Sequence, residues 1–140
     1  MSRVQIALNV SNIDEAVAFY SKMLGEKPAK QRPGYANFAI AQPPLKLVLI
    51  ENDKTAGTLN HLGIEVETSA EVAIAGDRFK QLGLATKTEE QVNCCYAVQD
   101  KVWVTDPDSS SWEIYTVLGD SESFCREAST QETVNCCKGD

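Results

Sequence analysis

The chain has 140 residues, of which 43% are hydrophobic and 24% are charged, and its formal net charge is −7. This length suits a single domain with an apolar core, and the acidic balance argues against nucleic acid, whose phosphates require clustered Lys and Arg. No run of about 18 apolar residues marks a membrane span, and the N-terminal stretch lacks the hydrophobic core of a signal peptide. We therefore expect a cytoplasmic protein without nucleic-acid or membrane partners.

The first half of the chain is predicted to form a strand, a helix and two more strands. These elements are a strand at 4–10, a helix at 13–25, and strands at 35–41 and 45–51. The first strand alternates apolar and polar residues and is rich in β-branched side chains, as strands are. Ser11 or Asn12 can cap the helix, and Gly25 can end it.

The second half repeats this order. It is predicted to contain a strand at 59–67, a helix at 70–83 capped by Thr68 or Ser69, and two strands within 101–117. Aligning Gln5 with His61 also aligns the glycines that end the two helices, once two residues are inserted. Such internal similarity indicates two fused modules.

The modules are expected at about residues 1–52 and 57–118, within one domain at 1–118. Residues 119–140 are polar and show no sustained hydrophobic period. We therefore expect them to form a mobile tail.

Three polar residues stand on the strand faces opposite to the apolar residues. Because side chains alternate across a strand, Gln5, His61 and Glu113 point away from the helix-packing residues of their own strands. If the modules curl into one concave sheet, an amide oxygen, an imidazole and a carboxylate can converge on Fe(II), Mn(II), Ni(II) or Zn(II). Taken singly, each residue could instead be solvated or merely hydrogen-bonded. The equivalent positions of Gln5 and His61 favour the metal site.

Two pairs of adjacent cysteines need a separate explanation: Cys94 and Cys95 in "QVNCCYAV", and Cys136 and Cys137 in "VNCC". They could be disulfide partners, zinc ligands, inert buried residues or a clamp for a thiol-seeking atom. Five cysteines cannot all pair within one chain, and cytoplasmic thiols are normally reduced, which disfavours disulfides. Since neighbouring residues of a regular strand point to opposite faces, a clamp at Cys94 and Cys95 requires a loop or bulge.

Three of these features together resemble the vicinal oxygen chelate superfamily over residues 3–118. They are the two modules, Gln5 and His61 in equivalent strands, and "DPDSSSWEIY" at 106–115. The last stretch is similar to the family's DP-x-G-x-x-x-E hairpin, with Ser109 where glycine is usual. The resemblance implies an α+β fold of two βαβββ modules that form a cupped mixed sheet with a metal site inside.

Within that superfamily, "NHLGIEV" and "CCYAVQDKVWVTDPDSSSWEIYTV" resemble the organoarsenical carbon–arsenic lyase and cadmium-induced protein branch. This resemblance assigns Gln5, His61 and Glu113 to Fe(II), and Cys94 and Cys95 to trivalent arsenic. Glyoxalase I has a further glutamate on the strand at 45–51, where this chain has lysine or leucine. Three protein ligands leave positions open for substrate and O₂, which weighs against glyoxalase chemistry.

The function expected from this resemblance is that of a dioxygenase-type lyase. It would use Fe(II) and O₂ to cleave the carbon–arsenic bond of trivalent organoarsenicals, such as methylarsonous acid and reduced aromatic arsenicals, and release arsenite. The alternative is a non-catalytic protein that binds Cd(II) or arsenite through its thiols. Cys136 and Cys137 could capture substrate for Cys94 and Cys95, or they could be incidental cysteines of the mobile tail. The protein is expected to be a monomer or a homodimer.

Overall fold

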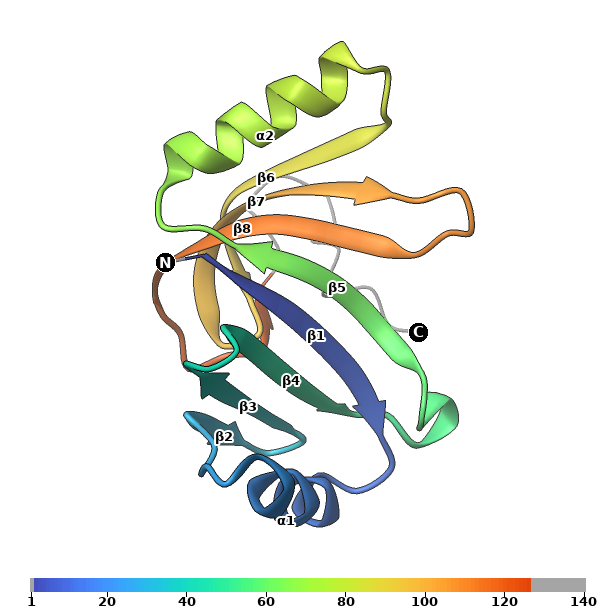
Figure 1. The fold of residues 1–140 in the computed structure, drawn as a ribbon, viewed down its shortest axis with the longest axis vertical. Coiled ribbons are helices and arrows are strands. Elements are labelled where there is room, and N and C mark those ends of the chain that lie inside the picture. The colour runs from blue at the N-terminus through green and yellow to red at the C-terminus, as the bar shows by residue number, and fades with distance from the viewer. Residues whose placement is uncertain (1, 127–140) are drawn as a thin grey trace. The chain divides into compact units, whose positions relative to one another are not determined.

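The computed structural model describes residues 2–126 (Figure 1). The chain divides into two compact units, Ser2–Gly63 and the residues from Ile64 onward. The division falls inside strand β5 (Leu59–Glu65). Each unit has its own helix and its own apolar core.

The first unit contains one helix and a small mixed sheet. Its elements are β1 (Arg3–Val10), α1 (Ile13–Leu24), β2 (Lys30–Arg32), β3 (Tyr35–Ile40), β4 (Leu45–Glu51), the 3₁₀ turn η1 (Asp53–Thr55) and the start of β5. Strand β4 pairs in parallel with β1 and antiparallel with β3, which pairs antiparallel with β2. Asn12 caps α1 by accepting a hydrogen bond from the backbone N–H of Glu15, and Gly25 ends the helix at φ 69°.

The alternation along β1 decides which side of the first unit is apolar. Ile6, Leu8 and Val10 pack with the buried cluster that contains Phe38 and Leu49. The alternate residues of β1 lie on the opposite face, and Gln5 and Asn9 are nevertheless buried there, each 4% exposed. The first unit therefore has buried polar groups on the face away from its helix.

The second unit repeats the arrangement with longer strands. Its elements are α2 (Ser69–Gln81), β6 (Thr86–Cys94), β7 (Ala97–Thr105), β8 (Ser111–Asp120) and β9 (Cys125–Arg126). Strand β7 pairs antiparallel with β8 and with β6, and β6 pairs antiparallel with β9. Thr68 and Glu71 form a capping box at the start of α2. Val72 and Ala75 of the helix pack on Val102 and Ile114 of the sheet.

The predicted α+β fold of two βαβββ modules is confirmed, as β1-α1-β2-β3-β4 and β5-α2-β6-β7-β8. The sequence prediction missed β2 and β6. Residues 119–126 were assigned to the tail, but β8 ends at Asp120 and β9 pairs with β6. The rest of the expected tail, with Cys136 and Cys137, lies outside the described residues. Within residues 2–126 no helix is long and apolar enough to cross a membrane.

The turn between β7 and β8 shows what replaces the usual glycine. Ser109 has φ 71°, a left-handed conformation that costs a residue with a side chain about 1 kcal/mol or more relative to glycine. The carboxylate of Asp106 accepts hydrogen bonds from the backbone N–H groups of Asp108 and Ser110, which holds the turn in this shape. The departure at Ser109 is therefore tolerated at a local cost.

We predict that Ser109→Gly stabilises the protein by about 0.5–1 kcal/mol in urea unfolding, because glycine adopts positive φ without strain. Gly83→Ala is the matched opposite change, since Gly83 has φ 77° with no atom within 4 Å of an added Cβ. It should destabilise by about 1 kcal/mol through backbone strain alone. A loss of stability in Ser109→Gly would contradict this account of the turn.

Candidate functional site

Gln5 and His61 come together on the polar face of the first unit. The amide nitrogen Nε2 of Gln5 lies 3.0 Å from Nε2 of His61, and both side chains are buried. Lys46 lies opposite Gln5 in the parallel β1–β4 register, so the neighbouring strand presents an amine there and no carboxylate. The pair that the internal repeat singled out is thus in direct contact.

A chain of hydrogen bonds leads from the other ring nitrogen of His61 to the backbone. The Thr58 hydroxyl donates to the carbonyl of Thr55 (2.6 Å) and accepts from Nδ2 of Asn9 (2.9 Å). Oδ1 of Asn9 accepts from Nδ2 of Asn60 (2.9 Å), and Oδ1 of Asn60 lies 2.7 Å from Nδ1 of His61. Asn60, Asn9 and Thr58 therefore each donate a hydrogen bond in the direction of the Thr55 carbonyl.

This direction fixes the tautomer of His61. Because Oδ1 of Asn60 can only accept, Nδ1 of His61 must carry the proton. Nε2 then carries the lone pair, and the Gln5 amide donates to it. Metal-binding histidines commonly have this arrangement, in which one nitrogen donates to a neighbouring oxygen and the other presents its lone pair.

We predict that the imidazole ¹⁵N spectrum of the metal-free protein shows a neutral Nδ1–H tautomer. The assignment is unambiguous because His61 is the single histidine of the chain. Asn60→Asp keeps the accepting oxygen and should preserve the Nδ1–H signal, whereas Asn60→Leu removes it and should shift the population toward Nε2–H. An Nε2–H tautomer in the unchanged protein would contradict the chain of hydrogen bonds.

In the second unit, Glu113 forms a buried ion pair with Lys101. Nζ of Lys101 lies 2.7 Å from Oε2 of Glu113, and the two side chains are 0% and 3% exposed. The ammonium group also lies 5.4 Å from the ring centre of Trp103 and 5.7 Å from that of Tyr115. The carboxylate that the sequence proposed as a ligand is therefore held by a neighbouring charge within its own sheet.

The sequence prediction missed two further buried side chains on this face, those of Glu89 and Lys101. Glu89 faces Lys101 in the β6–β7 register and accepts a 2.7 Å hydrogen bond from Nε1 of Trp103. Along β7, Lys101 and Trp103 alternate with Val102, which packs under α2. Their side chains therefore point to the opposite face of the sheet. This alternation was a signal in the sequence for the face on which Lys101 lies. Lysine and glutamate side chains, however, are normally exposed to solvent.

We predict that Lys101→Met destabilises the metal-free protein by about 3–5 kcal/mol, since it leaves the Glu113 carboxylate buried without its cation. The double change Lys101→Met with Glu113→Gln removes both charges and should recover most of that loss. Urea unfolding of the unchanged protein, the two single variants and the double variant measures the coupling free energy. A coupling below about 1 kcal/mol would show that the pair is not a buried ion pair in solution.

The first cysteine pair lies at the tip of the β6–β7 hairpin. Cys94 is the last residue of β6, and the connecting residues Cys95 and Tyr96 have φ values of 53° and 62°. Two consecutive residues at positive φ are typical of a two-residue type I′ turn, which usually contains asparagine and glycine. The turn brings the Sγ atoms of Cys94 and Cys95 to 3.7 Å from each other. The expectation that the pair leaves regular strand geometry is confirmed.

The sequence disfavoured disulfides, but the structure contains one. Cys94 and Cys125 are disulfide-bonded, and they lie opposite each other in the β6–β9 register. Cys95 remains a thiol. Cys125 was not singled out from the sequence, because its contact depends on a strand of two residues that returns along β6. The adjacent cysteines Cys94 and Cys95 do not bond to each other, and a disulfide between neighbouring residues would be strained.

Cys94 and Glu113 lie on the same face of the second sheet. Cys94 faces Ala97 across the hairpin, and Glu113 faces Trp103 across β7 and β8. Ala97 and Trp103 are six residues apart on β7, so their side chains point to the same face. Six residues span roughly 20 Å along a straight strand. The register shifts within both ladders, and the hairpin bends toward its tip in Figure 1, as expected next to β-bulges.

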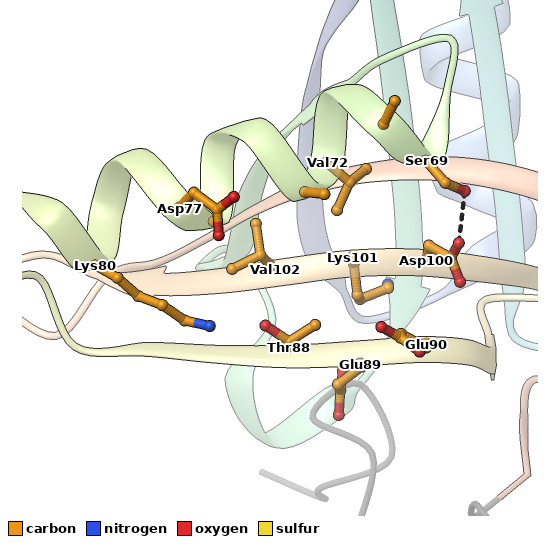
Figure 2. Close-up of a pocket in the computed structure, with 13 residues that line it drawn as sticks. Ser69, Val72, Asp77, Lys80, Thr88, Glu89, Glu90, Asp100, Lys101 and Val102 are labelled. Carbon is orange, nitrogen blue, oxygen red and sulfur yellow. Dashed lines mark hydrogen bonds between the residues drawn. The ribbon is translucent and has the colours of Figure 1, made fainter.

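A pocket of the second unit lies elsewhere, between α2 and strands β6 and β7 (Figure 2). Its volume is about 510 Å³. Asp77 and Lys80 of the helix and Glu90 and Asp100 of the strands line it. It contains neither Glu113 nor a cysteine, but Lys101, the partner of Glu113, is among the residues that line it.

Comparison with known proteins gives a family and two groups of named relatives. The model of the glyoxalase/bleomycin resistance protein/dioxygenase superfamily matches residues 3–114. The chain is 54% identical to the cadmium-induced protein CadI of Mycobacterium tuberculosis, over 99% of this chain and 95% of the relative. It is 58% identical to a trivalent organoarsenical cleaving enzyme of Thermomonospora curvata, over 90% of this chain and 84% of that enzyme.

The fold also resembles that of a solved dioxygenase. An extradiol ring-cleaving dioxygenase from B. fuscum aligns with a TM-score of 0.63 at 20% identity. The alignment covers 86% of this chain and 34% of the dioxygenase. At this identity the likeness concerns the fold alone.

Proposed function

Because this chain belongs to the glyoxalase/bleomycin resistance protein/dioxygenase superfamily, we propose that it is an Fe(II)- and O₂-dependent enzyme that cleaves the carbon–arsenic bond of trivalent organoarsenicals. Methylarsonous acid and reduced aromatic arsenicals are the proposed substrates, and arsenite is the inorganic product. The relative named as a trivalent organoarsenical cleaving enzyme, at 58% identity, supports this assignment. We further propose that the protein acts in the cytoplasm as a monomer or homodimer.

The observation that carries the proposal is the approach of Cys94 and Cys95 at the hairpin tip. Their Sγ atoms are 3.7 Å apart, close enough to bond one arsenic atom. Once the disulfide between Cys94 and Cys125 is reduced, a trivalent organoarsenical R–As(OH)₂ exchanges its two hydroxyls for the thiols of Cys94 and Cys95 and releases two waters. The carbon substituent then stays on the arsenic, next to Cys94, which lies on the sheet face that also carries Glu113.

Gln5, His61 and Glu113 are the proposed ligands of Fe(II), which when bound supplies the activation of O₂. Imidazole, carboxylate and amide oxygen form a donor set that suits Fe(II) and leaves positions open. The tautomer of His61 fits this role, since Asn60 holds Nδ1–H and leaves the lone pair on Nε2. The Gln5 amide presents nitrogen to that lone pair, so it must turn over to present its oxygen.

A second function is favoured by the relatives named cadmium-induced protein, at 54% identity over almost the whole chain. In that reading the thiols bind Cd(II) or arsenite without catalysis. A thiol buffer has no use for the buried polar groups around His61 and Glu113, which is why we place the enzyme first. Both readings predict arsenical binding at Cys94 and Cys95, and turnover separates them.

The decisive experiment uses the whole protein, reduced and loaded with Fe(II) under anaerobic conditions. Methylarsonous acid is added first and air second, and arsenite is measured over time. We expect arsenite to appear only after air and only with Fe(II). Stoichiometric binding of the arsenical without any arsenite would favour the buffer over the enzyme.

Variants separate the two parts of the proposed site. Cys95→Ser should weaken methylarsonous acid binding at least about tenfold while the iron content is unchanged, because it removes one of two soft ligands. His61→Ala should abolish arsenite release while arsenical binding persists. Glu113→Gln is preferable to alanine, since it keeps a hydrogen-bond acceptor beside Lys101. Full activity of His61→Ala with iron would refute the ligand assignment.

Cys136 and Cys137 lie outside the described residues, so their capture of substrate stays a prediction. Removal of the chain after Arg126 should leave the rate at saturating substrate nearly unchanged. It should slow the reaction at low substrate with excess glutathione, since a tethered thiol pair has an effective concentration in about the millimolar range. Equal rates of the full and shortened chains under that competition would exclude the role.

A further inference from the structure

A third cysteine lies beside the proposed arsenic-binding pair. Cys94 and Cys125 are disulfide-bonded and face each other across β6 and β9, while Sγ of Cys95 lies 3.7 Å from Sγ of Cys94. We propose that Cys94, Cys95 and Cys125, once reduced, form a three-thiolate site for inorganic trivalent arsenic. The inference rests on the proposed function and extends it to the product.

The segment that carries Cys125 is fastened to the hairpin by several contacts. Nδ2 of Asn93 donates to the carbonyl (2.8 Å) and to the hydroxyl (3.0 Å) of Ser123. The ring of Phe124 packs edge-on against that of Tyr96 at 5.8 Å. The backbone N–H of Ser121 donates to the carbonyl of Tyr96. Because these contacts do not involve the disulfide, they keep Cys125 opposite Cys94 after reduction.

The valence of arsenic separates substrate from product at this cluster. A bound organoarsenical has one As–C bond and therefore takes two thiolates. Arsenite has three replaceable hydroxyls, so As(OH)₃ and three thiols give As(SR)₃ and three waters, without oxidation or reduction. The Cys125 sulfur therefore forms no bond with an organoarsenical that already holds two thiolates, but it forms the third As–S bond with arsenite. This predicts that the protein distinguishes the two by Cys125.

Opening the site requires a reductant, for which we name a low-molecular-weight monothiol. Two such thiols convert the disulfide into two protein thiols and one external disulfide, with two electrons transferred. In the oxidised state no three His, Cys, Asp or Glu side chains among residues 2–126 are arranged to hold a metal ion. Cys94 is buried, whereas Cys95 is half-buried. Cys95 is thus the thiol that an incoming arsenical meets first.

The test uses the full-length chain with Cys136→Ser and Cys137→Ser, reduced with a phosphine, which has no thiols of its own. Thiol titration should give one thiol before reduction and three after it, since these two changes leave three of the five cysteines. Arsenic X-ray absorption should show three sulfur neighbours with arsenite and two with phenylarsenous acid. In Cys125→Ser, arsenite should keep two sulfur neighbours.

Affinity gives the second readout. Cys125→Ser should weaken arsenite binding at least about tenfold, as expected for loss of one tethered ligand, and leave phenylarsenous acid binding within about twofold. Glu122→Gln is the matched control on the same segment, since the exposed Glu122 side chain takes part in none of the contacts named above, and it should leave arsenite binding within about twofold. Two sulfur neighbours for arsenite in the unchanged cluster would overturn the proposal and leave the proposed function standing. Failure of both arsenicals to bind would instead refute the proposed function.

Discussion

The strand faces turned away from the helices bury polar side chains, and this burial determines much of the structure around the proposed site. A polar group without a hydrogen-bond partner costs several kcal/mol when it leaves water. Gln5 therefore pairs with His61, Glu113 with Lys101, and Glu89 with Trp103. Each of these contacts fixes a side chain before any ligand arrives. The hydrogen bonds that lead from His61 to the carbonyl of Thr55 satisfy four side chains in the same way. They thereby decide which imidazole nitrogen carries the proton.

The same contacts have a consequence for metal binding in the proposed site. In the metal-free protein, Gln5 donates to the lone pair of His61, and Lys101 neutralises Glu113. A metal held by these residues must replace one hydrogen bond, worth about 0.5–1.5 kcal/mol, and must compete with a buried ammonium group. The proposed ligands are each held in place within their own unit, and the partners that hold them reduce their affinity for a metal. Gln5 and Lys101 thus have comparable effects in the two modules, although their chemistry differs.

The sequence predicts the elements whose pattern is local, and it fails where a contact depends on distant residues. Alternation identified the strand face of Gln5, and capping residues placed both helices, because each signal lies within a few positions. Strand β6 was missed because a charged run and the shift between Glu89 and Val92 hide its alternation. Lys101 is fully buried only because Glu113, twelve residues away, neutralises it. Cys125 gave no signal at all, since its role depends on a two-residue strand that pairs with β6.

The hairpin tip shows how backbone strain and soft-ligand geometry are connected. A two-residue hairpin of asparagine and glycine would adopt positive φ at little cost, whereas Cys95 and Tyr96 each cost about 1–2 kcal/mol in that conformation. Glycine in place of Tyr96 would relieve its strain but would remove the ring that packs on Phe124. An extended Cys95 would point to the face opposite Cys94, as neighbours in a strand do. The strained turn is therefore the condition for both sulfur contacts: it brings Cys95 to Cys94, and through Tyr96 it secures the segment that carries Cys125.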